Sequence, residues 1–369
     1  MAITRIITPS ITDSSIPNVK MSNIVQSKNI IINGDMSIAQ RGTSVSSLTS
    51  SNTYKTIDRY ATELGSNGTW TQSQSTDVPT GQGFAKSLKM DCTSTGSGGY
   101  LHITQRFEGQ NLQYLKKGTS SAESFTLSFW VKSAKTGTYI AEFRDIDNTR
   151  NISKSYTISS ANTWEKKTIT FPGDTSGALG NDNGPSLELN LWLAAGSGNT
   201  SGTLQTSWGS QVAVNRAVGQ VNLGDSTSND WYVTGVQLEA GTTASEFEFL
   251  PYDLNLRRCQ RYYTRWQGDG SDERSIANGL CCGTGQVRMI VVYPTTLRTN
   301  PTVTEVGLET LNAVKVATAV SLNATVDSGI NGVNAQINAD SGTPYTVGQA
   351  VSLRTSTSAS AFLAVDAEL

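Results

Sequence analysis

Short stretches in which apolar and polar residues alternate recur along most of the chain, and this pattern predicts β-strands. The clearest is Phe125–Lys132, where every second residue is Phe, Leu, Phe or Val. Stretches 138–144, 187–193 and 231–239 alternate in the same way. Gly, Asn, Asp and Ser separate such stretches every ~8–15 residues. The apolar residues within the stretches do not recur with the period of a helix. The pattern therefore predicts an all-β protein.

The stretch Trp231–Trp266 divides the chain into a large and a small part. It begins as a last strand, Gly241 ends that strand, and Pro251 marks a break before a connector rich in Leu, Arg and Tyr. The many strands before this point and their long loops favour a jelly roll over an immunoglobulin-like sandwich. We therefore expect an extended N-terminal arm at 1–28, an antiparallel jelly-roll β-sandwich at 29–250, the connector at 251–264, and a smaller C-terminal β-sandwich domain at 265–369.

Residues 29–44 predict the first strands of the jelly roll. The apolar run Ile30–Ile32 leads into Asn33–Gly34, a common two-residue hairpin turn, and residues 36–40 alternate again before Gly42. We expect two short strands joined at Asn33–Gly34.

The composition narrows the class of function. Charged residues are 16% of the chain and the net charge is −2, which gives no electrostatic case for binding nucleic acid or an anionic membrane. No apolar run is long enough for a transmembrane helix, and the N-terminus lacks a signal-peptide pattern. The four cysteines form no C-x-x-C pair and His102 is the one histidine. We therefore expect free thiols in a reducing compartment, no metal site and no cofactor.

The second domain has few large apolar side chains for its length of about 105 residues, so it would bury little surface alone. Association with copies of itself would bury more surface and would cover strand edges. The sequence therefore predicts self-association through this domain.

Tryptophans and polar residues share one side of several predicted strands. A pyranose ring packs its C–H face on an indole, while its hydroxyls bond to planar amide, carboxylate or guanidinium groups. Such residues on one concave sheet would form a sugar cleft. Alternatively, these tryptophans are buried under loops or against another subunit, and Trp70 or Trp208 in loops are further candidate platforms. The candidate glycan-binding residues are Trp130, Glu142, Arg144, Asn190, Trp192, Trp231 and Gln237.

A polysaccharide-degrading enzyme is the rival class. Hydrolysis needs two carboxylates ~5–10 Å apart, and Glu142, Glu188 and Glu239 could supply them if their strands align. No nucleophile-elbow, zinc-protease or P-loop motif is present, and no solenoid repeat. We therefore expect no catalytic activity.

Two further clusters have simple structural interpretations. The Asp residues of several turns are expected to form those turns and not a calcium site, since none matches an EF-hand loop. They are Asp145, Asp147, Asp174 and Asp182. The arginines of the connector are expected to make interdomain ion pairs and to stack on tyrosines. They are Arg257, Arg258, Arg261 and Arg265.

A series of motifs, in this order and spacing, resembles a family of bacteriophage virion proteins and prophage tail-fibre or tail-spike proteins, common in phages of marine bacteria and cyanobacteria. The resemblance covers about 29–369 and implies a jelly roll like those of carbohydrate-binding modules, an appended β domain, a homotrimer and a place on the virion. It carries over no residue-level site. The motifs are Asn29–Asp35, Ala39–Ser44, Asp58–Tyr60, Phe125–Tyr139, Ala161–Gly177, Trp231–Gly241, Cys259–Tyr263, Tyr293–Val303 and Asp366–Leu369.

Together these expectations describe a homotrimeric phage fibre or spike protein that folds in the host cytoplasm and becomes part of the virion. Residues 1–28, outside the resemblance, would dock to other virion proteins, and the jelly roll would bind a host surface polysaccharide. Weak sugar stacking would be multiplied by three linked sites. The alternatives are a purely structural capsid or tail fibre without glycan binding, and a polysaccharide-degrading spike.

Overall fold

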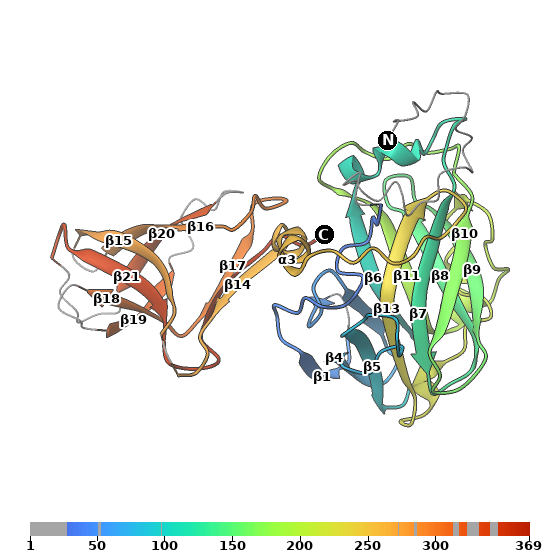
Figure 1. The fold of residues 1–369 in the computed structure, drawn as a ribbon, viewed down its shortest axis with the longest axis horizontal. Coiled ribbons are helices and arrows are strands. Elements are labelled where there is room, and N and C mark those ends of the chain that lie inside the picture. The colour runs from blue at the N-terminus through green and yellow to red at the C-terminus, as the bar shows by residue number, and fades with distance from the viewer. Residues whose placement is uncertain are drawn as a thin grey trace, which may run out of the picture.

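The computed structural model describes residues 28–50, 53–96, 98–271, 273–283, 286–312, 317–322, 332–339 and 346–369. Its regular secondary structure is almost entirely antiparallel strands, which confirms the all-β prediction. Figure 1 shows two β units side by side, with the helix α3 (Tyr252–Gln260) between them. No helix in these ranges is long and apolar enough to cross a membrane. The predicted docking arm at 1–28 lies outside the described residues, apart from Lys28.

The larger unit is a sandwich of two antiparallel sheets, as the jelly-roll prediction requires. Across the six-stranded sheet lie β1 (Ser44–Leu48), β4 (Thr69–Ser75), β5 (Ser87–Ser94), β13 (Asp230–Ala240), β7 (Phe125–Ser133) and β10 (Glu165–Phe171). Across the seven-stranded sheet lie β12 (Gly209–Ser210), β9 (Arg150–Ile158), β8 (Gly137–Asp145), β11 (Pro185–Ala195), β6 (Tyr100–Glu108), β3 (Ala61–Gly65) and β2 (Thr53–Tyr54).

Short helical turns occur where the chain leaves these strands. Two of them, η2 (Gly109–Asn111) and η3 (Gln113–Leu115), follow β6. Three others lie in the long segment between β11 and β13 and are α2 (Ser197–Thr200), η4 (Ala213–Asn215) and η5 (Leu223–Asp225).

The core between the sheets follows from the alternation in the sequence. The four apolar residues of β7 and the four leucines of β11 are all buried and belong to one hydrophobic cluster. Phe125 of β7 meets Phe143 of β8 edge-on, with ring centroids 4.9 Å apart. Burying one such side chain is worth roughly 1.5–3 kcal/mol, so this cluster holds the two sheets together.

A bulge in β13 changes which of its residues face the core. Its register with β7 shifts around Gly235, whose φ of +62° is a left-handed conformation that glycine tolerates. Trp231 faces the core before the bulge, and Val236 and Leu238 face it afterwards. The sequence-based assignment of Trp231 and Gln237 to one side of this strand is therefore wrong, because it assumed an unbroken alternation.

Residues 30–43 do not form the two predicted strands. They make turns beside β13, where Val236 donates its N–H to the carbonyl of Gly34 at 2.9 Å. The side-chain amide of Asn33 holds this loop, because it donates to two backbone carbonyls at 2.9 and 3.0 Å. A Cβ at Gly34 would lie 2.1 Å from the carbonyl oxygen of Val236. The pair Asn33–Gly34 thus anchors a loop and is not a hairpin turn.

The second unit combines a closed barrel with a three-stranded sheet. Its hydrophobic core includes Val287, Leu353 and Leu363, and the unit is all-β, as expected for this part of the chain. Around the barrel lie β15 (Ser275–Gly283), β16 (Gln286–Val292), β20 (Gly332–Ala339), β19 (Ala317–Leu322), β18 (Leu308–Asn312) and β21 (Ala350–Thr355). Across the three-stranded sheet lie β14 (Tyr263–Gln267), β22 (Phe362–Asp366) and β17 (Thr302–Val306).

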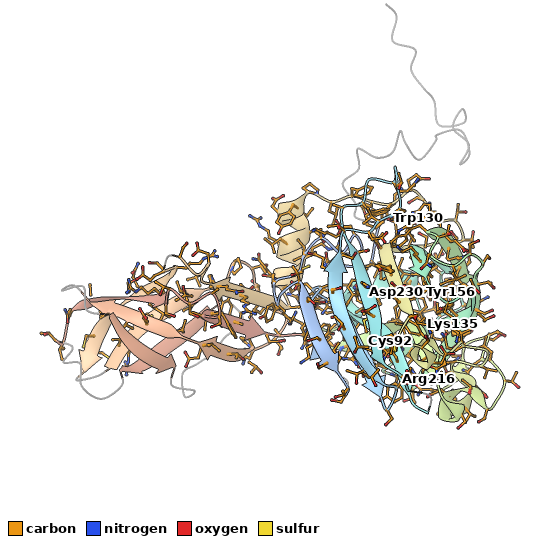
Figure 2. All side chains as sticks on the ribbon, turned by 90° about the horizontal axis from the view of Figure 1, so that it is seen from below. Cys92, Trp130, Lys135, Tyr156, Arg216 and Asp230 are labelled. Atoms are coloured by element: carbon orange, nitrogen blue, oxygen red, sulfur yellow. The ribbon has the colours of Figure 1, made fainter. Side chains whose placement is uncertain are left out.

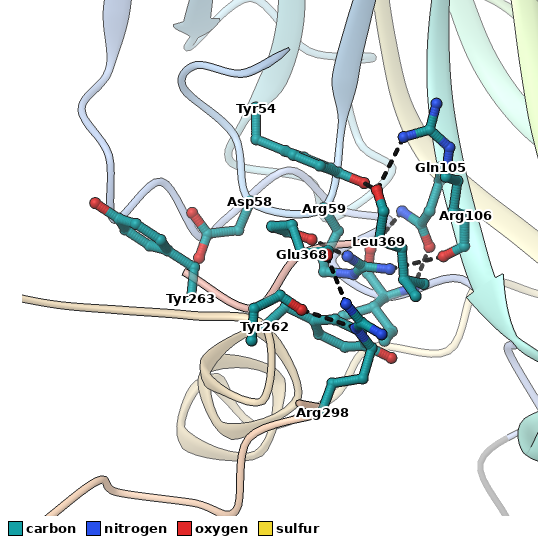
Figure 3. A network of polar contacts seen from close by, with 12 residues as sticks. Tyr54, Asp58, Arg59, Gln105, Arg106, Tyr262, Tyr263, Arg298, Glu368 and Leu369 are labelled. Carbon is teal, nitrogen blue, oxygen red and sulfur yellow. Dashed lines mark hydrogen bonds and ion pairs between the residues drawn. The ribbon is translucent and has the colours of Figure 1, made fainter. Parts of the chain in front are cut away.

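Three of the motifs noted above meet at the junction of the two units (Figure 3). They are Asp58–Tyr60, Cys259–Tyr263 and Asp366–Leu369. The buried guanidinium of Arg59 pairs with Glu368 and lies over the ring of Tyr262, 3.5 Å from its centroid. The motifs therefore have a shared structural role, which is to join the two units.

The connector arginines contribute to this junction only in part. Arg261 makes the expected interdomain pair, with Glu108 at 2.7 Å, and Arg265 lies over the ring of Phe362. The expected stacking on tyrosines comes instead from arginines of the jelly roll. One of these is Arg41, whose guanidinium lies 3.6 Å from the ring centroid of Tyr263.

Candidate glycan-binding surfaces

The seven predicted glycan-binding residues are divided between the two sheets. Glu142, Arg144, Asn190 and Trp192 belong to the seven-stranded sheet, and Trp130, Trp231 and Gln237 to the six-stranded sheet. Because the core lies between the sheets, their outer faces point in opposite directions. The expectation of one concave surface that unites these residues is therefore wrong.

On the outer face of the seven-stranded sheet, the carboxylate of Glu142 is fully buried. Arg216, from the segment between β11 and β13, donates two hydrogen bonds to it at 2.8 Å. Asn151, Asn190 and Trp192 donate three more, at 3.0 to 3.2 Å. These donors occupy the acceptor sites of both oxygens. Glu142 therefore fastens the covering segment to the sheet and is not open to a sugar hydroxyl.

Glu188 is held in a similar way on the same face. Arg106 and Arg144 each donate to it at 2.8 Å, and Asn190 donates at 2.9 Å. Burial alone would raise the pKa of Glu188, but the charges of Arg144 and Arg106 outweigh burial and lower the pKa to about 2. This carboxyl is therefore ionised at ordinary pH and cannot serve as a general acid. Both arginines of this network reach solvent in part, with 29% of the side chain of Arg144 and 19% of that of Arg106 exposed.

Trp192 cannot act as a stacking platform, because its ring is fully buried. The ring of His102 lies 4.6 Å away between centroids, and the guanidinium of Arg216 lies 5.0 Å above the indole. Burial and the charge of Arg216 lower the pKa of His102 to about 3, so this histidine is neutral. For Trp192, the structure therefore agrees with the alternative that the tryptophan is buried under a loop.

Trp231 and Gln237 are also closed to ligands. Trp231 is fully buried in the core of the sandwich. The side chain of Gln237 donates to Glu239 at 2.8 Å and accepts from the N–H of Glu248 at 2.8 Å, beneath the segment that follows β13. Of the further candidate platforms, Trp70 is fully buried and the indole of Trp208 donates to a backbone carbonyl at 2.8 Å.

Trp130, which is labelled in Figure 2, differs from the other predicted tryptophans. It is half-buried, and it points away from the core that its strand neighbours Phe129 and Val131 enter. Its neighbours across the strands are Lys166 on β10 and Thr234 on β13. Within the described ranges, the indole N–H makes no hydrogen bond and the ring makes no aromatic contact. The indole therefore remains able to contact a ligand.

Lys132, two residues after Trp130 on β7, lies between two aromatic rings. The ammonium of Lys132 lies 4.2 Å from the ring centroid of Tyr232 and 5.7 Å from that of Trp164. Asp77 pairs with Lys132 and accepts the indole N–H of Trp164 at 2.9 Å. We call Trp130, Lys132, Trp164, Tyr232 and Asp77 the Trp130 face.

The chemistry of the Trp130 face suits a saccharide. Flat indoles accept the C–H face of a pyranose, and a carboxylate with an ammonium beside it bonds to hydroxyls. Burial would raise the pKa of Asp77, but hydrogen bonds from Lys132 and Trp164 outweigh it and lower that pKa, so the carboxylate is an ionised acceptor. The side chain of Asp77 is nearly half exposed.

Sequence reasoning missed Trp164 and Asp77 as members of this face. Trp164 directly precedes β10, whose first residue Glu165 pairs with Val131, so it comes to lie beside Lys132. The sequence feature that could have identified Trp164 is an aromatic residue directly before a predicted strand. Asp77 comes from the loop after β4, and nothing local in the sequence links it to β7.

The turn-forming Asp residues have the role predicted for them. Each accepts a backbone N–H within a turn or across a loop, and Asp174, for example, accepts that of Ser176 at 3.0 Å. The ammonium of Lys117 pairs with both Asp145 and Asp174 and fills the space between them. Among the described residues, no group of three or more His, Cys, Asp or Glu side chains could hold a metal ion.

No protein family and no curated protein matches the sequence. Among solved structures, the chain is similar to the enzymatically active domain of tailspike protein 4 of bacteriophage CBA120, at 16% identity and a TM-score of 0.31, over 58% of this chain and 21% of that chain. It is also similar to the N-terminal cellulose-binding domain of β-1,4-glucanase C from Cellulomonas fimi (12% identity, TM-score 0.27, 50% and 90% of the chains). A xylan-binding domain of carbohydrate-binding module family 22 matches at 8% identity and a TM-score of 0.28, over 55% and 99%. TM-scores near 0.3 assign no ligand, reaction or binding site to this chain.

Proposed function

We propose that this chain is a bacteriophage fibre or spike protein that attaches the virion to a glycan on the host surface. The ordered motifs that resemble phage virion proteins support the virion location. Three of them, Asp58–Tyr60, Cys259–Tyr263 and Asp366–Leu369, build the junction between the units and so account for their presence together in one chain. The protein folds in the host cytoplasm before it joins the particle, and residues 1–28 dock to other virion proteins.

The exposure of Trp130 beside a charged pair carries the glycan proposal. The half-buried indole of Trp130 lies two residues from Lys132 on β7, and Lys132 pairs with the partly exposed Asp77, although Lys132 and Tyr232 are themselves largely buried. Truncation of such an aromatic anchor in a binding surface costs about 2 kcal/mol or more. The affinity of one such site for a sugar is low, because a flat face buries little of the ligand.

A homotrimer would raise this affinity through valency. The outside of the barrel offers an apolar surface for self-association, because three aliphatic side chains on β15 and β16 and a fourth in the turn before β21 are largely exposed. They are Leu280 at 57%, Ile290 at 64%, Val292 at 71% and Val347 at 66%. Exposed apolar groups of this kind mark association surfaces, so we assign the trimer contact to the barrel.

The second candidate is a purely structural fibre without glycan binding. The closed polar network around Glu142 favours it, since the predicted sugar-binding residues on the seven-stranded sheet are engaged in packing. The polysaccharide-degrading alternative has less support. Glu142 and Glu188 are held by arginines, and Glu239 is bound to Gln237 and Ser245.

A binding experiment on an array of bacterial surface polysaccharides tests the proposal. Wild type is expected to bind a subset of them, and Trp130→Ala is expected to lose about tenfold or more in affinity, as ~1.4 kcal/mol gives a factor of ten. Tyr252→Ala is the matched control, because this tyrosine is 64% exposed on α3 and lies outside the Trp130 face. Equal binding by Trp130→Ala and wild type would reject the Trp130 face, and the structural-fibre candidate would then stand.

A further inference from the structure

A cavity of about 580 Å³ lies beside α3, and none of its lining residues belongs to the Trp130 face. Ile30 and Ile32 line it from the loop that precedes β1, and Asn111 and Tyr114 line it from the turns after β6. Arg258 lines it from α3. Its volume falls within the range of small-molecule sites, about 300–1,000 Å³.

Arg258 brings a positive charge to this cavity without a matching carboxylate. Among the described residues, no acid oxygen lies within the 4.0 Å of an ion pair from its guanidinium, and its hydrogen bond at 3.2 Å goes to the carbonyl of Asn29. Glu248 acts on it at longer range and accepts the N–H of Asn29 at 2.9 Å. Burial outweighs these influences and lowers the pKa of Arg258, so its surroundings leave the charge under-compensated.

The other charged groups around the cavity are already paired. Arg261 donates two hydrogen bonds to Glu108 at 2.7 Å, and the hydroxyl of Tyr262 donates a third to the same carboxylate. Arg106 pairs with Glu188 and with a second acid on β3. The lining therefore has a surplus of positive charge, and that surplus is located at Arg258.

Apolar surface faces the same space. Tyr114 is 48% exposed, and partial burial raises the pKa of its phenol to about 12, so the phenol is neutral. Tyr114 and Arg258 both line this cavity. A flat ring and a guanidinium that share one cavity can contact a sugar ring and an acidic group on it together.

We propose that this cavity binds a carboxylate-bearing sugar residue of the host glycan, a uronic or ulosonic acid, with its carboxylate on Arg258 and a C–H face of its ring on Tyr114. A guanidinium offers two parallel N–H donors to the two oxygens of a carboxylate. A neutral sugar has no carboxylate and cannot form this pair of hydrogen bonds. This inference rests on the proposed glycan attachment and adds to it a second contact, which selects acidic polysaccharides.

Ligand-observed NMR on the full chain tests this with sugars that differ in one group. Glucuronic acid and galacturonic acid are compared with glucose and galactose, and N-acetylneuraminic acid is the ulosonic acid. At least one acid is expected to bind about tenfold more tightly than the neutral sugars. Arg258→Gln is expected to abolish this preference, and Arg258→Lys to reduce it, since the charge remains but the paired donors are lost.

Arg257→Gln is the matched control, because Arg257 is exposed on the same helix and does not line the cavity. It is expected to keep the preference for the acid. Equal binding of acids and neutral sugars would overturn the inference, as would a preference that survives Arg258→Gln. The Trp130→Ala result is separate from these outcomes, so this cavity can fail as a site while the proposed attachment function stands.

Discussion

The ion pair between Arg59 and Glu368 joins residues 309 positions apart in the chain. Arg59 is fully buried in the jelly roll, and Glu368 follows the last strand of the second unit. Glu368 has a second ion-pair partner, Arg41, at 3.3 Å. Among the described residues, Arg59 forms an ion pair with Glu368 alone. Since a desolvated guanidinium needs its anion, this contact ties the two units into one structure.

Glu368→Gln should therefore strongly destabilise the junction. Removal of one member of a buried ion pair costs about 3–5 kcal/mol, because the other charge stays buried without compensation. Differential scanning calorimetry is expected to show a lower midpoint and separate unfolding of the barrel unit. The control is Glu123→Gln, since Glu123 forms an exposed pair with Lys116 at 2.8 Å, worth about 1 kcal/mol or less. Similar effects of the two variants would contradict a buried, linking role for Glu368.

The low pKa of Glu188 makes a defined part of the stability dependent on pH. Its pKa is about 2 in the folded protein, against 4.5 as the ordinary value. The carboxylate therefore stabilises the fold above about pH 4.5, and that contribution is lost as the pH falls toward 2. Glu188→Gln is expected to be less stable than wild type in urea at pH 7 and much closer to wild type at pH 3. A difference in unfolding free energy that is the same at both pH values would rule this out.

Lys117 should act as the internal counter-ion of its loop. Its ammonium pairs with Asp145 and Asp174 and also donates to the backbone carbonyl of Gly177 at 2.7 Å. Lys117→Met would remove the cation that lies between two buried carboxylates. We therefore expect the free energy of unfolding to fall by about 3 kcal/mol or more, measured by thermal unfolding. Lys116→Met, at the neighbouring and exposed position, is expected to change stability by less than about 1 kcal/mol. A Lys117→Met protein as stable as the Lys116→Met protein would contradict this role.

The fold could be predicted from the sequence because its signal is local. A period of two residues on β7 and β11 places their apolar side chains in the core without knowledge of any partner strand. The structure differs from the predicted strands where a single residue changes the path of the backbone. Gly235 inserts a bulge that reverses the sides of β13, and Asn33 folds the first predicted hairpin into a loop through its side chain.

The candidate site was less predictable, because alternation does not say which sheet a strand joins or what covers its outer face. Trp130 and Trp192 occupy equivalent outward positions, yet they lie on opposite sheets. Trp192 is covered by a segment that brings Arg216 onto Glu142, a contact between residues 74 positions apart. The cluster of connector arginines predicts an interdomain ion pair for Arg258. Its place beside a cavity depends on the loop before β1 and the turns after β6, which the local sequence does not bring together.

The most direct test of the attachment function is a calorimetric titration of wild type and Trp130→Ala with the surface polysaccharide of a susceptible host, at equal oligomeric mass. The expected result is saturable binding by wild type and affinity lower by about tenfold or more for Trp130→Ala, with unchanged thermal unfolding. Absence of binding by wild type, or equal affinity of the two proteins, would contradict the account and favour a fibre whose tryptophans serve only its structure.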